Sequence, residues 1–96
     1  MLIRTQSKMR VCNLQRMEEI SIEKRDDKRG GETAFFLTMR FSSEETDNCE
    51  LGEYSTQKRA VEILDEICLA YLNLNSFSYR GEVPYVKNGI FQMPEA

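Results

Sequence analysis

The feature that most constrains the fold is a long run from Ser55 to Asn75 that contains neither glycine nor proline. Its apolar residues recur at three- and four-residue steps, the spacing that places side chains on one face of a helix. That face comprises Ala60, Ile63, Leu64, Ile67, Tyr71 and Leu74. A hydroxyl at Ser55 or Thr56 can cap the first turn, because it accepts a bond from a backbone N–H that has no helical partner. The run predicts one helix of about five turns, whose apolar face must be covered.

Three further residues widen this apolar stripe: Val61, Cys68 and Leu72. The charged residues of the run lie opposite the stripe or at its borders, as in a helix with one solvent-facing side. The stripe is therefore wider than one face of a sheet needs, and part of it is available for another contact.

The rest of the chain predicts the sheet that covers this helix. Strand-like runs occur at Leu2–Thr5, Met9–Cys12, Glu19–Glu23, Thr33–Phe41 and Cys49–Tyr54. Because the strands precede the helix instead of alternating with helices, the order favours an α+β fold. We expect one domain over residues 1–96. It comprises an antiparallel meander of about four to five strands packed by one long helix (about 55–74), then a C-terminal strand or hairpin.

The strongest strand signal is Thr33–Phe41. Alternate residues from Phe35 to Phe41 share one face, which is the natural partner of the helix. Phe36 falls on the other face. Both sides of this strand are therefore expected to be partly covered, by curvature of the sheet or by another subunit.

The C-terminal segment contains two apolar runs, Val83–Val86 and Ile90–Pro94, on either side of a turn with the pair Asn88-Gly89. Asn-Gly between apolar runs predicts a hairpin, because both residues tolerate positive φ. The proline in each run restricts that run to the edge or end of a sheet. The segment is thus predicted to be a terminal hairpin, or a single edge strand at Ile90–Met93 added to the main sheet.

The charge balance argues against nucleic acid and against a membrane as partners. The net charge is −3, so no global positive field attracts either polyanion. Residues 1–48 are balanced, and residues 49–96, with four basic and seven acidic residues, account for the excess. The chain has no signal-peptide pattern and no uncharged run of about 18 residues. We expect a cytoplasmic protein with no membrane contact.

The three cysteines, Cys12, Cys49 and Cys68, form no CxxC pair, and the sequence has no histidine. A zinc site takes four ligands, so we expect no metal site. Each cysteine lies beside apolar residues in a predicted strand or helix. Buried, reduced thiols are therefore expected, which fits a reducing cytoplasm.

The sequence predicts no catalytic residue and no cofactor. Glu62, Asp65 and Glu66 lie on one side of the predicted helix, but their spacing is equally that of a solvated face. Cys68 has apolar neighbours and no evident base to activate it. Gly30-Gly31 precedes a strand, whereas phosphate-binding loops lead into the N-terminus of a helix. We therefore expect a protein that is not an enzyme.

Four short motifs stand at Met1–Arg4, Leu51–Thr56, Leu64–Ile67 and Phe91–Pro94. Together they resemble those of a group of short proteins from Gram-positive gut bacteria and their phages or mobile elements. The similarity covers most of the chain. It departs at Cys12, where the group usually reads valine-asparagine-leucine without the cysteine. No activity is established for the group, so the resemblance implies a biological context and no catalytic residues.

Protein–protein association is the function that we expect. Aromatic residues are favoured in interfaces, and five here are candidates: Phe36, Phe77, Tyr79, Tyr85 and Phe91. For each of them the alternative is that it closes the core. As a set they predict contact with a protein partner or with a second copy (a homodimer), through the C-terminal tail or a sheet edge.

The alternative function is an accessory nucleic-acid-binding or regulatory protein. The predicted hairpin tip at 24–29 gathers four basic residues that could contact phosphates: Lys24, Arg25, Lys28 and Arg29. Two aspartates interrupt them, and a solubilising tip is the ordinary explanation of such a segment. A contiguous basic stripe reaching Arg10, Arg16 and Arg40 would favour this alternative. Basic residues isolated among acidic ones would favour the interaction module.

Overall fold

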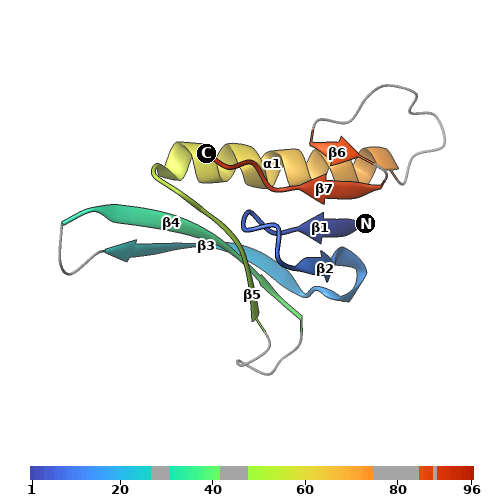
Figure 1. Cartoon of the computed structure of the whole chain (residues 1–96), viewed down its shortest axis with the longest axis horizontal. Coiled ribbons are helices and arrows are strands. Elements are labelled where there is room, and N and C mark those ends of the chain that lie inside the picture. Colours follow the sequence, from blue (N-terminus) through green and yellow to red (C-terminus); the bar gives the residue numbers. More distant parts are fainter. Residues whose placement is uncertain (27–30, 42–47, 75–84, 88) are drawn as a thin grey trace.

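The computed structural model describes residues 1–26, 31–41, 48–74, 85–87 and 89–96, and it has an α+β fold (Figure 1). These residues form seven strands in two small sheets, one α-helix and one short 3-10 helix. The predicted class, the single long helix and the C-terminal hairpin are confirmed. The strands expected in one meander are divided between the two sheets.

The three-stranded sheet contains β3 (Glu19–Asp26), β4 (Thr33–Arg40) and β5 (Asn48–Tyr54), in that order and antiparallel. Its central strand shows the alternation that the sequence predicts, because Leu37 and Met39 are fully buried and Phe36 lies on the other face. The ends of β3 and β4 project beyond the first turn of the helix (Figure 1).

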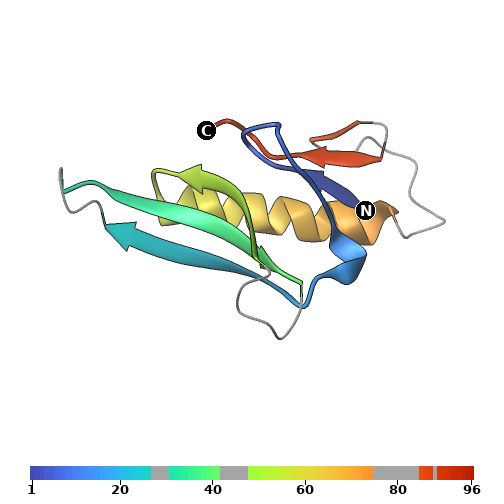
Figure 2. The ribbon, with the colours of Figure 1, turned by 60° about the horizontal axis from the view of Figure 1, so that its bottom comes forward.

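Helix α1 (Gln57–Leu74) runs along the three-stranded sheet (Figure 2). Thr56 caps it: its Oγ1 accepts a hydrogen bond from the Arg59 N–H at 3.1 Å, and its carbonyl accepts one from the Ala60 N–H at 3.2 Å. The buried line of the helix comprises Ala60, Ile63, Ile67 and Ala70. Among the described residues, no helix is both long enough and apolar enough to span a bilayer.

The four-stranded sheet contains β1 (Leu2–Arg4), β2 (Val11–Asn13), β6 (Val86–Lys87) and β7 (Ile90–Gln92), in the order β2-β1-β7-β6. Strand β7 pairs antiparallel with β6 and parallel with β1. The two expectations for the C-terminal segment are therefore combined, since the hairpin forms and also adds to a sheet. Strand β7 is internal to that sheet, so it is no edge strand.

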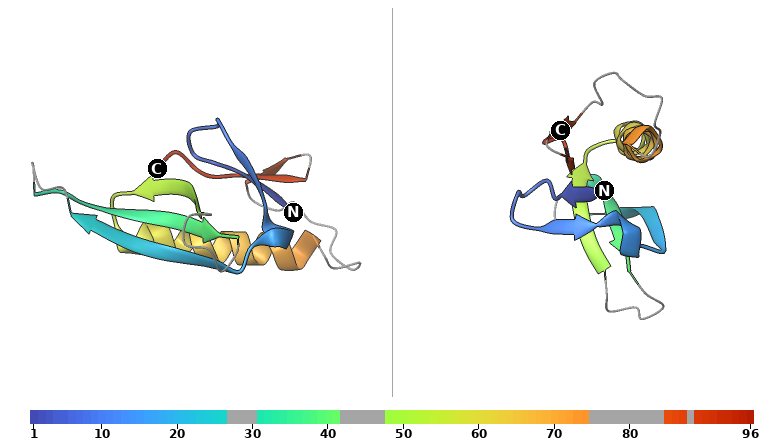
Figure 3. Two further views of the ribbon diagram at one scale, coloured as in Figure 1. Left: turned by 90° about the horizontal axis from the view of Figure 1, so that it is seen from below. Right: turned by 90° about the vertical axis from the view of Figure 1, so that its right-hand side faces the viewer.

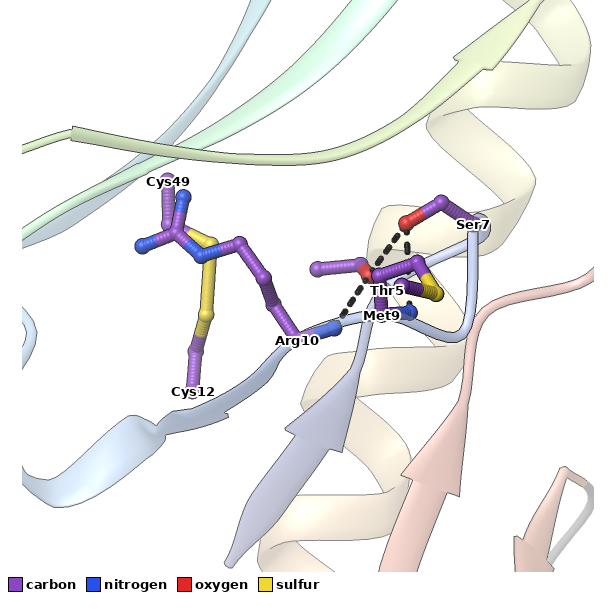
Figure 4. The surroundings of a disulfide bond; sticks show 6 residues. All are labelled: Thr5, Ser7, Met9, Arg10, Cys12 and Cys49. Atoms are coloured by element: carbon purple, nitrogen blue, oxygen red, sulfur yellow. Dashed lines mark hydrogen bonds between the residues drawn. A yellow bond between two sulfur atoms is a disulfide. The ribbon is translucent and has the colours of Figure 1, made fainter.

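The loop between β1 and β2 brings the two sheets together. Thr5 is buried, and its Oγ1 accepts a hydrogen bond from the Arg10 N–H at 3.3 Å and lies 3.0 Å from the Ser7 hydroxyl (Figure 4). These contacts present Gln6 to β5, where the Gln6 N–H donates to the Leu51 carbonyl at 2.7 Å.

One hydrophobic core lies between α1 and the two sheets (Figure 3). Its largest fully buried side chains come from every layer: Ile3, Leu37, Met39, Leu51, Tyr54, Ile63, Ile67, Phe91 and Met93. Because Phe91 and Met93 are among them, the end of the chain is part of the core. The 3-10 helix η1 (Leu14–Arg16) closes one side of this core with Leu14, which is 4% exposed.

The structure confirms that Cys12 and Cys49 are buried, but it corrects the prediction that all three cysteines are buried, reduced thiols. Cys12 on β2 and Cys49 on β5 form a disulfide that joins the two sheets (Figure 4). Cys68 is a free thiol and is exposed on α1. The prediction was wrong because local patterns describe strands one at a time. Cys12 and Cys49 are 37 residues apart, and their pairing arises from the tertiary contact between β2 and β5.

Candidate functional site

An apolar hollow of about 440 Å³ lies between the C-terminal half of α1 and the start of β3. We call it the α1–β3 groove. It is lined by Leu14, Gln15, Met17, Ile20, Ile67, Cys68, Tyr71 and Leu72. Ile67, which is 1% exposed, belongs to the core beneath the groove, whereas Leu72 is 64% exposed at its rim. The groove therefore connects the core with the surface of the helix.

Helix α1 leaves several large apolar side chains exposed to solvent. Leu72 is 64%, Leu69 52% and Tyr71 40% exposed. Val61, nearer the start of the helix, is 39% exposed. The three residues that widen the apolar stripe in the sequence, Val61, Cys68 and Leu72, are thus exposed to solvent. Covering such surface is favourable by about 25 cal/mol per Å² of apolar area.

Leu69 is a residue that the sequence analysis missed. It lies three positions before Leu72, and residues three apart are neighbours on a helix. Its position on the helical wheel, off the line of Ala60, Ile63 and Ile67, was the available signal. That signal is weak, because an isolated exposed leucine is common on protein surfaces.

Strand β3 forms an edge of the three-stranded sheet next to the groove. It pairs with β4 along all eight of its residues, and within the described part of the chain it pairs with no other strand. Ile20, on the inner face of β3, also lines the groove. An edge strand presents a row of backbone donors and acceptors to which another strand can add.

Phe36 on the outer face of β4 is covered by a charged side chain. The guanidinium carbon of Arg25 lies 4.2 Å from the centroid of the Phe36 ring, in a cation–π contact. Arg25 also pairs with the Glu23 and Glu50 carboxylates, each at 2.6 Å. The hydrogen bonds that Arg25 donates to Glu23, and then to Glu50, raise the pKa of Arg25. The cover expected over Phe36 is thus supplied by the same sheet.

Of the other predicted interface aromatics, only Tyr85 and Phe91 lie in the described residues, and they do not form an exposed site together. Tyr85 is 40% exposed, and its ring meets that of Phe91 edge to face, with the centroids 5.7 Å apart. Phe91 is fully buried, which favours the core alternative for this residue. Phe77 and Tyr79 lie outside the described residues. Neither Phe36 nor Tyr85 lines the α1–β3 groove.

Two of the four basic residues predicted for nucleic-acid binding lie in the described part of the chain. Lys24 and Arg25 lie on β3, and both are exposed. Lys28 and Arg29 lie outside the described residues. Arg40, on the neighbouring strand, lies 3.8 Å from a carboxylate oxygen of Glu18 and 4.0 Å from one of Glu19. Both described arginines of the three-stranded sheet, Arg25 and Arg40, therefore lie beside acidic side chains.

The described residues contain no group of three or more histidine, cysteine, aspartate or glutamate side chains that could hold a metal ion. The chain was also compared with protein-family models, with curated proteins and with solved structures, and none of them matches it.

Proposed function

We propose that this protein is a non-enzymatic protein–protein interaction module, and that the α1–β3 groove is its contact surface. The observation that carries the proposal is the exposure of Leu69, Tyr71 and Leu72 beside an apolar hollow that leads down to the core. Exposed apolar side chains beside an apolar hollow are typical of sites that bind another protein.

The charge distribution supports a protein partner over nucleic acid. Arg25 pairs with Glu23 and Glu50, so it is compensated within its own sheet. Arg40 has acidic neighbours as well. Nucleic-acid binding depends on uncompensated positive charges that displace counterions from phosphates. Basic residues set among acidic ones are the arrangement that the sequence analysis associates with an interaction module.

The test is a pull-down from native-host lysate, with and without nuclease, using three versions of the tagged chain. Wild type is compared with Leu72→Glu, which places a charge at the rim of the groove. The matched control is Lys58→Glu, a charge change at an exposed position in the first turn of the same helix. Both positions are exposed, so both variants are expected to fold with stabilities within about 0.5 kcal/mol of wild type.

We expect a protein that is retained after nuclease by wild type and by the Lys58→Glu control, and lost with Leu72→Glu. Retention of the same protein by Leu72→Glu would contradict the groove as contact surface. Recovery that disappears with nuclease would contradict the module and favour the nucleic-acid alternative. Recovery of no protein other than a monomeric bait would contradict protein binding altogether.

A further inference from the structure

The longest free edge among the described strands belongs to β3. The four-stranded sheet ends in β2 and β6, which have three and two residues, whereas β3 has eight. The other edge of the three-stranded sheet, β5, has seven residues, but Gln6 already bonds to the backbone of Leu51 and Glu53 on it. Short edge strands offer few backbone groups to a partner, and a long one offers a complete ladder. An additional strand on this protein would therefore form most of its hydrogen bonds at β3.

The charges of β3 are arranged so that the strand complements itself. In an antiparallel pair with a two-fold axis at Ile22, each residue faces the one that lies equally far on the other side of Ile22. Glu19 then faces Arg25 of the second copy, and the same pair forms twice, in addition to the pairs of Arg25 with Glu23 and Glu50 in its own sheet. Ser21 faces Glu23, and Ile22 faces Ile22. Between Glu19 and Arg25, this register places no two like charges opposite each other, and the one like pair is Asp26 with Glu18 at the end of the strand.

The α1–β3 groove lies next to the free edge of β3, because Ile20 of this strand is one of its lining residues. Ile20 lies on β3 and also lines the groove with Leu72, so in this register Lys24 of the second copy lies opposite Ile20 and its aliphatic stem can cover this end of the groove. Pairing would therefore satisfy the edge hydrogen bonds and shield exposed apolar surface in one contact. A symmetric interface buries each of these features twice.

We infer that the partner is a second copy of this chain, joined by antiparallel pairing of β3 with β3 about Ile22. The two three-stranded sheets then form one continuous six-stranded sheet, with the two helices on the same face. This inference rests on the proposed function, since it names the partner of the α1–β3 groove.

The first test uses one position with two opposite charges. In the dimer, residue 21 of each copy faces Glu23 of the other copy. Ser21→Glu therefore introduces two repulsive charge pairs, whereas Ser21→Lys introduces two attractive ones. We expect sedimentation equilibrium to show a dimer for wild type. Its dissociation constant should rise roughly fivefold with Ser21→Glu and fall by a similar factor with Ser21→Lys. Thermal unfolding of dilute samples checks that each variant is folded.

The second test locates the axis by cross-linking in a Cys68→Ser background, which removes the exposed thiol. With Ile22→Cys, the two introduced thiols face each other at a Cα separation of about 5 Å, within reach of a disulfide. With the control Lys24→Cys, the two thiols are offset by four residues, roughly 14 Å along the strand. We expect a cross-linked dimer from Ile22→Cys alone.

A monomer at every concentration would overturn the inference. So would a dimer that is insensitive to both charges at position 21, or one that cross-links through position 24 and not through position 22. A dimer dissociated by Leu72→Glu but indifferent to Ser21→Glu would overturn strand pairing while leaving the groove as the contact. A monomer that still retains another protein through the groove would separate failure of this inference from failure of the proposed function.

Discussion

The side-chain amide of Gln6 pairs with the backbone of Glu53 through two hydrogen bonds, as a neighbouring strand would. Its Oε1 accepts from the Glu53 N–H at 2.9 Å, and its Nε2 donates to the Glu53 carbonyl at 3.0 Å. The same Nε2 lies 3.1 Å from the Pro94 carbonyl and 2.8 Å from that of Glu95. One side chain thus connects the β1–β2 loop, strand β5 and the end of the chain.

Replacement of Gln6 is predicted to destabilise the fold through these contacts. Gln6→Ala removes them and should lower the free energy of unfolding by about 1–2 kcal/mol, because part of the site is exposed to water. Gln6→Glu keeps the shape of the side chain, but its carboxylate cannot donate to the three carbonyls. We therefore expect Gln6→Glu to cost at least as much as Gln6→Ala in urea unfolding at neutral pH.

The control for Gln6→Glu is the same change at Gln57, an exposed residue in the first turn of α1. A carboxylate there interacts favourably with the helix dipole, so Gln57→Glu should be neutral or slightly stabilising. If Gln6→Glu were as stable as wild type, the donor role of Nε2 would be excluded.

Gly52 on β5 is predicted to accept a side chain only at a cost in stability, because the β1–β2 loop and Tyr54 lie close to it. A Cβ at position 52 would lie 3.0 Å from the Tyr54 hydroxyl oxygen and 3.3 Å from the Gln6 Cβ. Gly52→Ala should therefore lower the free energy of unfolding by about 1–3 kcal/mol, the usual cost of overpacking. Chemical denaturation of the two proteins measures this difference.

A double-mutant cycle tests the cause. Tyr54→Phe removes the oxygen atom that the new methyl group would approach most closely. The cost of Gly52→Ala should then be smaller in the Tyr54→Phe background than in wild type. Additive effects would mean that the tyrosine hydroxyl is not the source of the clash.

The helix and the strands were predictable because their signals are local. Thr56 supplies a cap, and no residue from Gln57 to Leu74 breaks the helix. In β4, the alternation around Leu37 and Met39 is sufficient to assign the buried face. These features depend on neighbouring residues, which a single sequence displays directly.

The division into two sheets was not predictable in this way. Strand β1 begins at Leu2, and its parallel partner β7 begins at Ile90. Such pairing is decided by the packing of the whole chain, and periodicity within a strand carries no information about its partner. The disulfide between Cys12 and Cys49 escaped prediction for the same reason.

The candidate site was predictable only in part. The sequence indicated that the helix has more apolar surface than its sheet covers, and Leu72 is indeed 64% exposed. It could not indicate that Ile20 of β3 lies across from that surface. Phe91 was ambiguous for another reason: an aromatic residue serves an interface or a core equally well, and only its burial distinguishes the two roles.

Reduction of the Cys12–Cys49 disulfide is predicted to destabilise the protein. A bond across 37 residues restricts the unfolded chain, which corresponds to about 3–4 kcal/mol in the loop-entropy model. The midpoint of urea unfolding should therefore fall when a reductant is added. The paired variant Cys12→Ser/Cys49→Ser should show the lower midpoint with or without reductant.

Cys68→Ser is the matched control for this prediction, because Cys68 is exposed and forms no disulfide. Its unfolding midpoint should stay within error of wild type, and it should keep the full response to reductant. An unfolding midpoint of wild type that does not change on reduction would contradict the disulfide and indicate two buried thiols.

Tyr54 is predicted to make the stability depend on pH in the alkaline range. It is 2% exposed, and its hydroxyl donates to the Pro94 carbonyl at 2.8 Å. Burial raises the pKa of Tyr54 from the ordinary value of 10.0 to about 12. The folded state therefore holds the phenol proton more tightly than the unfolded state does. The resulting stabilisation is fully present below about pH 10 and is lost as the pH rises through about 12.

Urea unfolding at a series of pH values tests this prediction. Wild type should lose on the order of 2 kcal/mol between the two pKa values, in addition to any decline from other groups. Tyr54→Phe should be less stable at neutral pH by about 1 kcal/mol, because the hydrogen bond to Pro94 is lost. The variant should also decline less steeply with rising pH, since it has no phenol to ionise at this site. Parallel curves for the two proteins would show that the ionisation of Tyr54 does not control the alkaline transition.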